Sequence, residues 1–179
     1  MNKASILSTA SELRKRYGIP DPEKLCKDAG IILLYSQMGS EDYACKGFIL
    51  KLGSTVSITI NSDLPEDMQK IILIHELSHY FLHVSTGLAG AFQDFSAFSE
   101  AEIREYEANL LTAELLISDA ELTELLSEGF GFFECAAKLR VPAELLDFKL
   151  RLMREKGAAI AEAPISALGG FMQHLRMKD

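Results

Sequence analysis

The chain has 179 residues, of which 48% are hydrophobic and 25% are charged, and it carries a formal net charge of -8 at pH 7. This length and apolar content suit a single domain with one buried core. The acidic balance argues against direct binding to nucleic acid, because affinity for phosphates depends on clustered Lys and Arg. The first residues lack the continuous apolar segment of a signal peptide, and the longest apolar run, Ile71 to Ile74, is far too short to span a membrane.

The cysteines point to a reducing compartment. Cys26, Cys45 and Cys135 are scattered without a CxxC pair, which favours free thiols over a disulfide framework. Without a signal for export or a membrane segment, we expect a cytoplasmic protein. Its composition suits a protein or peptide partner better than nucleic acid or a membrane.

The first third of the chain combines helical and strand patterns. It predicts two helices followed by three strands, in chain order at residues 3–17, about 22–29, 31–35, 47–52 and 55–60. Gly53 and Ser54 predict a hairpin turn between the last two strands. We therefore expect a small three-stranded sheet.

The rest of the chain is mainly helical in pattern. Asp63 and Glu66 have the spacing of a capping box and predict a helix from there to about His83. Residues 85–98 have no clear period and are expected to form a loop. Four more helices are expected, at 99–117 with Ser99 as its cap, 119–127, 132–140 and 143–155.

The domain organisation follows from the end of the helical pattern. Residues 1–156 are expected to form a single domain, and 157–179 an Ala- and Gly-rich tail that is partly disordered. The last two helices flank a short turn, as in a helix-turn-helix. Glu144 and Asp147 in the second of them argue against reading DNA, so we expect these helices to pack against the domain.

The segment HELSH at residues 75–79 carries the clearest chemical signal. His75 and His79 are one helical turn plus about 40° apart, so both imidazoles project from one face and can bind a single ion. Glu76 is rotated by about 100° from His75 and stands beside that ion without binding it, where it can accept a proton from water. The apolar stripe around Leu77 points elsewhere, so we expect the histidines on the exposed face of the helix.

A catalytic zinc ion needs a third protein ligand and leaves one position to water. His83 would lie about 12 Å from His75 along the helix, too far to share the ion. Glu105 and Glu107 remain as candidates on the helix that follows Ser99. Glu105 shares its face with short side chains that allow a close helix approach, whereas Glu107 has bulkier neighbours. We favour Glu105 and keep Glu107 as the alternative.

These segments resemble the ImmA/IrrE metallo-endopeptidases, which are related in active-site plan to the thermolysin-like zincins. The resemblance covers INSDLP at 60–65, HELSHYFLH at 75–83 and EYEANLLTAELLIS at 105–118, and it extends weakly to the C-terminal helices. It implies an α+β, zincin-like fold with helices packed around a small three-stranded sheet. It also implies one zinc ion held by the HExxH histidines and a downstream glutamate. In the ExxAN part, Glu105 matches the ligand position and Asn109 the position of its polar partner.

Two functions remain open at this point. The first is a zinc-dependent endopeptidase in which Glu76 is the general base, although Mn2+ or Fe2+ would also suit this donor set. The resemblance implies that its substrate is a helix-turn-helix repressor and that it controls a mobile element or stress response. The second is a non-catalytic metal-binding module that binds a partner protein. Glu76 favours the enzyme, because a site that only binds metal does not need a carboxylate beside an open position.

An endopeptidase also needs a group that stabilises the developing oxyanion. The sequence offers several candidates that its spacing does not separate, namely Tyr43, His83, Arg104 and Tyr106.

Overall fold

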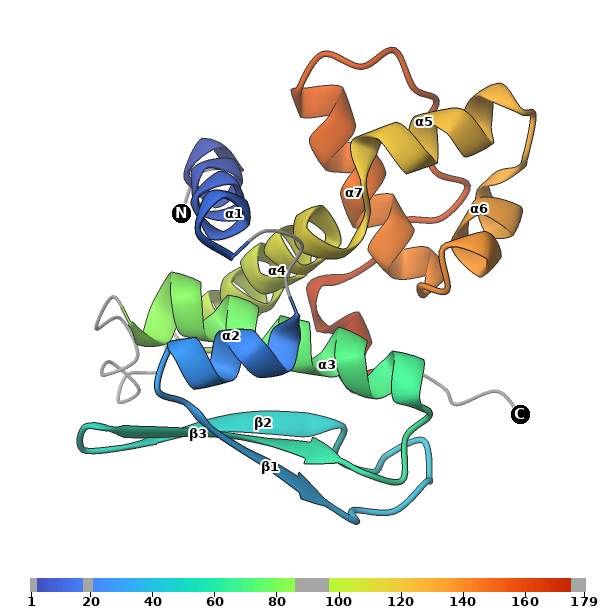
Figure 1. The fold of residues 1–179 in the computed structure, drawn as a ribbon. Coiled ribbons are helices and arrows are strands. Elements are labelled where there is room, and N and C mark those ends of the chain that lie inside the picture. Colours follow the sequence, from blue (N-terminus) through green and yellow to red (C-terminus); the bar gives the residue numbers. More distant parts are fainter. Residues whose placement is uncertain (1–2, 18–20, 86–96, 175–179) are drawn as a thin grey trace.

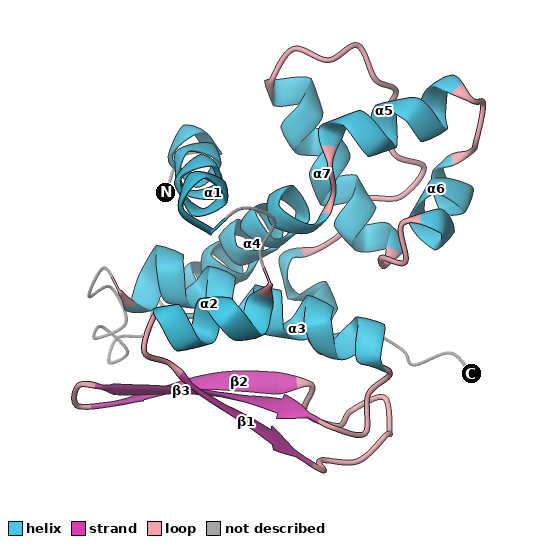
Figure 2. Cartoon of the chain, viewed as in Figure 1, coloured by secondary structure: helices cyan, strands magenta, loops and turns pink. Residues whose placement is uncertain are grey.

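The computed structural model describes residues 3–17, 21–85 and 97–174. The elements, in chain order, are α1 (Lys3–Tyr17), α2 (Pro22–Asp28), β1 (Ile32–Ser36), β2 (Gly47–Leu52), β3 (Thr55–Asn61), α3 (Glu66–His79), the π-helical turn η1 (Tyr80–Val84), α4 (Ala97–Leu116), α5 (Asp119–Ser127), α6 (Phe132–Lys138), α7 (Ala143–Glu155) and the 3-10 helix η3 (Gly169–His174). Figure 2 shows the strands as one layer, with the helices gathered on one side of it. The expected α+β fold, with helices around a small three-stranded sheet, is confirmed. Among the helices of these ranges, none combines the length and the apolar character that a membrane span requires.

The sheet is mixed, with the order β1-β3-β2. The central strand β3 is parallel to β1 and antiparallel to β2. Ile58 and Ile60 alternate along β3 and are fully buried, and β-branched side chains of this kind suit a strand that is covered on one face. Helix α3 lies across this face of the sheet (Figure 1). The sheet therefore supports α3, the helix that carries the HELSH segment.

The start of α3 differs from the prediction. The helix begins at Glu66 with Pro65 at its N-cap and no side-chain capping bond, so the predicted capping box is wrong. The Asp63 carboxylate instead accepts a hydrogen bond from the Gly39 N–H (2.8 Å), and the Asn61 side chain accepts one from the Asp63 N–H (2.9 Å). These polar side chains are therefore used to fix the loop between β1 and β2 against the end of β3.

Two further helix boundaries also differ from the prediction. The helix expected to continue to about His83 leaves the α-helical geometry after His79 and ends in the π-helical turn η1. Helix α4 begins at Ala97, so Ser99 is inside it rather than at its cap. Residues 86–96 of the expected loop lie outside the described residues.

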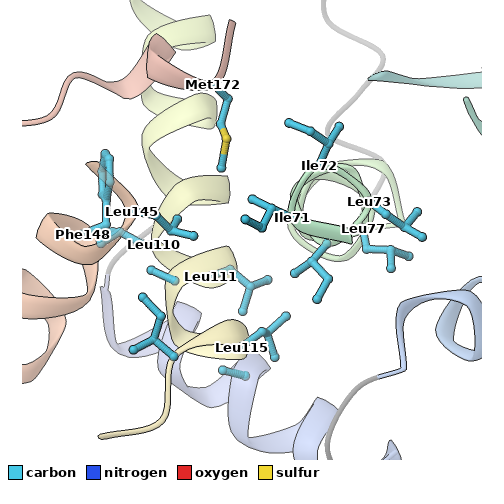
Figure 3. Packing of buried hydrophobic residues seen from close by; sticks show 14 of the residues in the cluster. Ile71, Ile72, Leu73, Leu77, Leu110, Leu111, Leu115, Leu145, Phe148 and Met172 are labelled. Atoms are coloured by element: carbon cyan, nitrogen blue, oxygen red, sulfur yellow. The ribbon is translucent and has the colours of Figure 1, made fainter. Parts of the chain in front are cut away.

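Helices α3 and α4 form the centre of the core. In Figure 3, Ile71 of α3 points toward α4, whereas Leu73 and Leu77 point away from it. On the other side of α4, Leu110 faces Leu145 of α7 (Figure 3). All five side chains are at most 4% exposed. Helix α4 is therefore held between α3 and α7, which fixes its position relative to the HELSH segment.

A buried ion cluster joins four helices at the C-terminal end of α4. Glu114 is 3% exposed and accepts hydrogen bonds from Lys149 (2.8 Å), Lys156 (2.8 Å) and Arg14 (3.1 Å). Asp119, at the start of α5, forms ion pairs with the same two lysines. Lys149 is fully buried, so its charge depends on these carboxylates. The cluster therefore ties α1, α5 and α7 to α4.

The segment after α7 folds back along the domain and reaches α4 (Figure 1). The Ala167 N–H donates to the Asp147 carboxylate (2.9 Å), and Arg151 donates to the Ala167 carbonyl (3.1 Å). Further along, the Phe171 ring stacks on Phe148 with centroids 5.7 Å apart. This segment is thus packed against α7 at Ala167 and Phe171, and η3 lies against α4.

Candidate metal centre

The structure brings His75, His79 and Glu105 together. Their potential ligand atoms all lie within 4.8 Å of one another. The two Nε2 atoms of the histidines are 3.1 Å apart, and each is 3.3 Å from one oxygen of the Glu105 carboxylate. Two side chains from α3 and one from α4 therefore point at a common position.

Small side chains explain how α4 comes close enough to supply Glu105. Ser78 of α3 and Thr112 of α4 are fully buried, and their hydroxyl oxygens are 3.1 Å apart in a hydrogen bond. Ala108, also fully buried, lies one turn before Thr112. Short side chains allow two helix backbones to approach closely. The predicted close approach of the Glu105 face to the HELSH helix is confirmed.

The donor set fits a divalent ion. Two imidazole nitrogens that face each other at 3.1 Å beside a carboxylate need a proton or a cation between them, because a neutral imidazole has only one N–H. Two histidine nitrogens and one carboxylate oxygen form a ligand set typical of catalytic zinc, which keeps its fourth position open. His75, His79 and Glu105 could therefore hold a metal ion, and the same donors also suit manganese or iron.

The alternative ligand Glu107 lies elsewhere. It is 5% exposed, and its carboxylate is 3.9 Å from Nε2 of His83. His83 itself lies on η1, with its ring centroid 5.6 Å from that of His79. Burial lowers the pKa of His83, and the neighbouring His79 acts in the same direction while Glu107 opposes it. The geometry thus separates Glu105, which faces both HELSH histidines, from Glu107, which faces His83.

Glu76 lies beside the three candidate ligands and is only 8% exposed. Burial raises the pKa of Glu76 to about 7. The nearby Glu105 also raises this pKa, whereas His79 lowers it. A cation at the neighbouring ligands would lower this pKa, because it favours the ionised carboxylate. A carboxyl group in such a position can both accept and return a proton near neutral pH, as acid–base catalysis requires.

The expected exposure of this helix face is wrong. His75 is 4% exposed and Glu76 8% exposed, because α4 packs against α3 and the segment leading into β2 forms the opposite wall. The helical period correctly separates these side chains from the apolar stripe around Leu77. The period alone does not reveal which neighbouring elements cover a polar face.

Asn109 has a partner that the sequence did not indicate. Its side-chain amide donates to the carbonyl of Gly169 in the C-terminal segment, while its Oδ1 is buried without a hydrogen-bond partner among the described residues. Within the same described part of the chain, Nδ1 of His75 is likewise buried without a partner. The predicted hydrogen bond from Asn109 to a ligand is therefore not present here, and Asn109 instead joins α4 to η3.

The candidate site opens into a cavity of about 730 Å3. Its walls come from α3, α4, β2 with the residues before it, and the C-terminal segment. Three of the four oxyanion candidates line it, namely Tyr43, His83 and Arg104, whereas Tyr106 packs edge-on against Phe148 at 5.4 Å.

Sequence reasoning missed the walls that β2 and the C-terminal segment contribute. Gly47 of β2 and Met172 of η3 both line the cavity. A Cβ atom at Gly47 would lie 2.7 Å from Cγ2 of Ile72, so glycine is required for this close approach of strand to helix. Gly47 is therefore the residue in the sequence that could have indicated that β2 lies close to α3 and lines the cavity. For Met172 the sequence offers no such signal, because the contact depends on how the end of the chain folds back.

Comparisons with known proteins agree with this site. The model of the peptidase family described as IrrE N-terminal-like domain matches residues 26–151, which run from α2 into α7 and include both HELSH and Glu105. Metallopeptidase ImmA of Bacillus subtilis (strain 168) is 27% identical over 157 residues, covering 87% of this chain and 89% of the relative. A metal ion is implied by such a family, and the His-His-Glu group provides a place for it. The chain therefore belongs to the ImmA/IrrE family of metallopeptidases.

Proposed function

We propose that this protein is a cytoplasmic zinc-dependent endopeptidase that cuts a helix-turn-helix repressor and thereby controls a mobile element or a stress response. The observation that carries the proposal is the convergence of His75, His79 and Glu105 beside the buried carboxylate of Glu76, in one cavity. A bound zinc ion would supply Lewis acidity that polarises the scissile carbonyl and acidifies the attacking water.

Glu76 performs the proton transfers in this proposal. Its carboxylate takes a proton from the attacking water as the oxygen of that water bonds to the scissile carbonyl carbon. It then gives the proton to the nitrogen of the leaving amine as the C–N bond breaks. The hydroxyl thus ends on the new carboxyl terminus and the proton on the new amino terminus. The burial of Glu76 supports this role, because few water molecules can compete for the proton.

The position of β2 supports a peptide as substrate. Among the described residues, β2 pairs only with β3, so its other edge is unpaired. The residues from Tyr43 to Ile49 line the cavity that contains the candidate ligands. Unpaired N–H and C=O groups of an edge strand can bind an extended peptide as an added strand. This arrangement would hold a peptide backbone next to Glu76.

The charge of the chain supports a basic partner. Its formal net charge is -8, and DNA-binding regulators carry clustered Lys and Arg. Opposite charge raises the rate at which two proteins meet and favours matching partners over others. A repressor is therefore the substrate class that we propose.

The test compares wild type with Glu76→Gln on the repressor encoded beside the gene and on casein. Glutamine keeps the shape of the side chain but cannot accept the proton, so Glu76→Gln should retain zinc and its Tm while cutting at least about 100-fold more slowly. Glu107→Gln is the matched control, because Glu107 is equally buried but faces His83. It should keep most activity.

Three results would count against the proposal. Undiminished cleavage by Glu76→Gln would exclude Glu76 as the base. Rapid digestion of casein with an intact repressor would exclude a selective regulator protease. A zinc-loaded protein that cuts neither substrate would favour the non-catalytic binding module.

A further inference from the structure

The cavity has an apolar floor next to the candidate catalytic residues. Ile72 precedes His75 by three residues and Glu76 by four, so all three side chains share one face of α3. All three line the cavity. A substrate side chain close to the bond attacked beside Glu76 would therefore meet Ile72 and the residues in contact with it.

Met172 is the other large apolar side chain at this floor. It comes from η3 and lines the same cavity as Ile72. Figure 3 shows the Met172 side chain pointing into the space between α4 and α3, where Ile71 and Ile72 project from α3. Met172 is 3% exposed and Ile72 2% exposed. Both side chains line the cavity while little of either is exposed to solvent, as is expected of residues at the bottom of a pocket.

Contacts with α4 and α7 fix the position of Met172. Asn109, one turn after Glu105, donates to the carbonyl of Gly169. A Cβ atom at Gly169 would lie 3.0 Å from the carbonyl oxygen of Glu102, so this glycine allows η3 to lie directly on α4. Next to Met172, Phe171 is stacked on α7. The methionine is therefore held by the same helix that supplies Glu105.

We propose that Met172 is a specificity-determining residue that, together with Ile72, sets the size of the apolar side chain accepted beside the scissile bond. The subsite would take an aliphatic or aromatic side chain, because Gly47, Ile72 and Met172 provide uncharged walls. Met172 lies beyond residues 26–151, the range matched by the family. Its replacement would therefore change substrate choice without changing the metal ligands. This inference rests on the proposed peptidase function.

The test measures side-chain preference in variants that change the floor in opposite directions. Peptides spanning the cleaved repressor bond, with Ala, Leu or Phe beside that bond, are compared by kcat/KM. Met172→Ala should raise the preference for Phe over Ala by about tenfold, a typical effect of a few methylene groups in an apolar pocket. Met172→Phe should lower it by a similar factor. Destabilisation alone would reduce the rate for all peptides and would not produce opposite shifts.

Met153→Ala is the matched control, since Met153 is 4% exposed in α7 and does not line the cavity. It should lower the Tm while leaving the preference unchanged. If Met172→Ala fails to fold, Met172→Val enlarges the floor less and should give a smaller shift in the same direction.

A binding measurement separates this inference from the proposed function. Amino-acid hydroxamates with Ala or Phe side chains are titrated into the zinc-loaded Met172 variants, and the ratio of the two Kd values is compared. If wild type cuts no peptide but this ratio shifts with residue 172, the proposed function fails and the role of Met172 stands. If the peptides are cut with one preference in all Met172 variants, the role of Met172 is overturned and the function stands. If wild type cuts no peptide and neither hydroxamate binds to its zinc-loaded form, both are overturned.

Discussion

Replacing Glu105 by alanine should weaken metal binding far more than replacing Glu107. Glu105 has its two carboxylate oxygens 3.3 Å from the two HELSH histidines, whereas Glu107 faces His83 at 3.9 Å. Loss of a group that only supports a ligand weakens metal binding about 10- to 100-fold. Loss of a ligand itself should therefore exceed about 100-fold. The same change at Glu107 should leave the affinity within a few-fold of wild type.

This loss of affinity converts into a measurable change in Tm. A protein stabilised by saturating zinc loses about 2.7 kcal/mol of that stabilisation when its affinity falls about 100-fold. For a chain of this size, each kcal/mol corresponds to roughly 2–4 °C in Tm. The zinc-dependent rise in Tm should therefore shrink by about 5–11 °C in Glu105→Ala and stay unchanged in Glu107→Ala.

The measured quantity must be the difference between melts with and without zinc. Burial alone would raise the pKa of Glu105, but hydrogen bonds from His75 and His79 hold it well below its usual range. Removing Glu105 thus also changes the stability of the metal-free protein. Chelator-treated wild type, Glu105→Ala and Glu107→Ala are each melted before and after zinc is added, and bound zinc is counted by elemental analysis. An intact zinc-dependent rise in Glu105→Ala, together with its loss in Glu107→Ala, would refute the assignment.

Three further predictions concern the metal centre and the buried ion cluster. His79→Ala should reduce bound zinc from about one ion per chain to near zero in elemental analysis, and equal zinc in both proteins would exclude the site. Lys149→Ala should lower the free energy of unfolding in urea by about 3–5 kcal/mol, because Glu114 is left buried without this partner, and a loss below about 1 kcal/mol would show that the remaining cations suffice. Burial would raise the pKa of Asp119, but hydrogen bonds from Lys149 and Lys156 lower this pKa. The stabilisation that Asp119 contributes is therefore fully present above the unfolded pKa of about 3.9, and it is lost as the pH falls through the lower pKa of the folded state. The Tm difference between wild type and Asp119→Asn should accordingly be present at pH 7 and vanish in strong acid; a difference independent of pH would contradict this origin.

The sequence predicts the site correctly where the pattern lies within one helix. The spacing of His75, Glu76 and His79 indicates a metal-binding helix face, and the short neighbours of Glu105 correctly predict that α4 approaches α3. The sequence does not predict which hydrogen bond a polar side chain makes when several partners are available. Asp63 has the right spacing for a cap, yet the structure uses its carboxylate to bind the Gly39 backbone.

Contacts between distant segments were also beyond local patterns. Helical period places Glu76 on a polar face, but its burial depends on α4 and on the segment before β2. Met172 reaches the cavity only because the chain after α7 returns to α4. In both cases the deciding interaction joins segments far apart in the sequence, about which composition and spacing carry no information.

The buried ion cluster also restricts the routes by which this sequence can change. Lys149 is fully buried and Glu114 nearly so, so a mutation that removes one charge leaves the other in the core with fewer partners: Glu114 keeps Arg14 and Lys156, and Lys149 keeps Asp119. Buried ion pairs can often be replaced by apolar side chains of similar volume without loss of stability, but only when both partners change. We expect positions 114 and 149 to show strong epistasis: each single replacement is deleterious, while a combined replacement such as Glu114→Leu with Lys149→Met is tolerated far better than the single changes predict. Related sequences should therefore carry both charges or neither at these two positions.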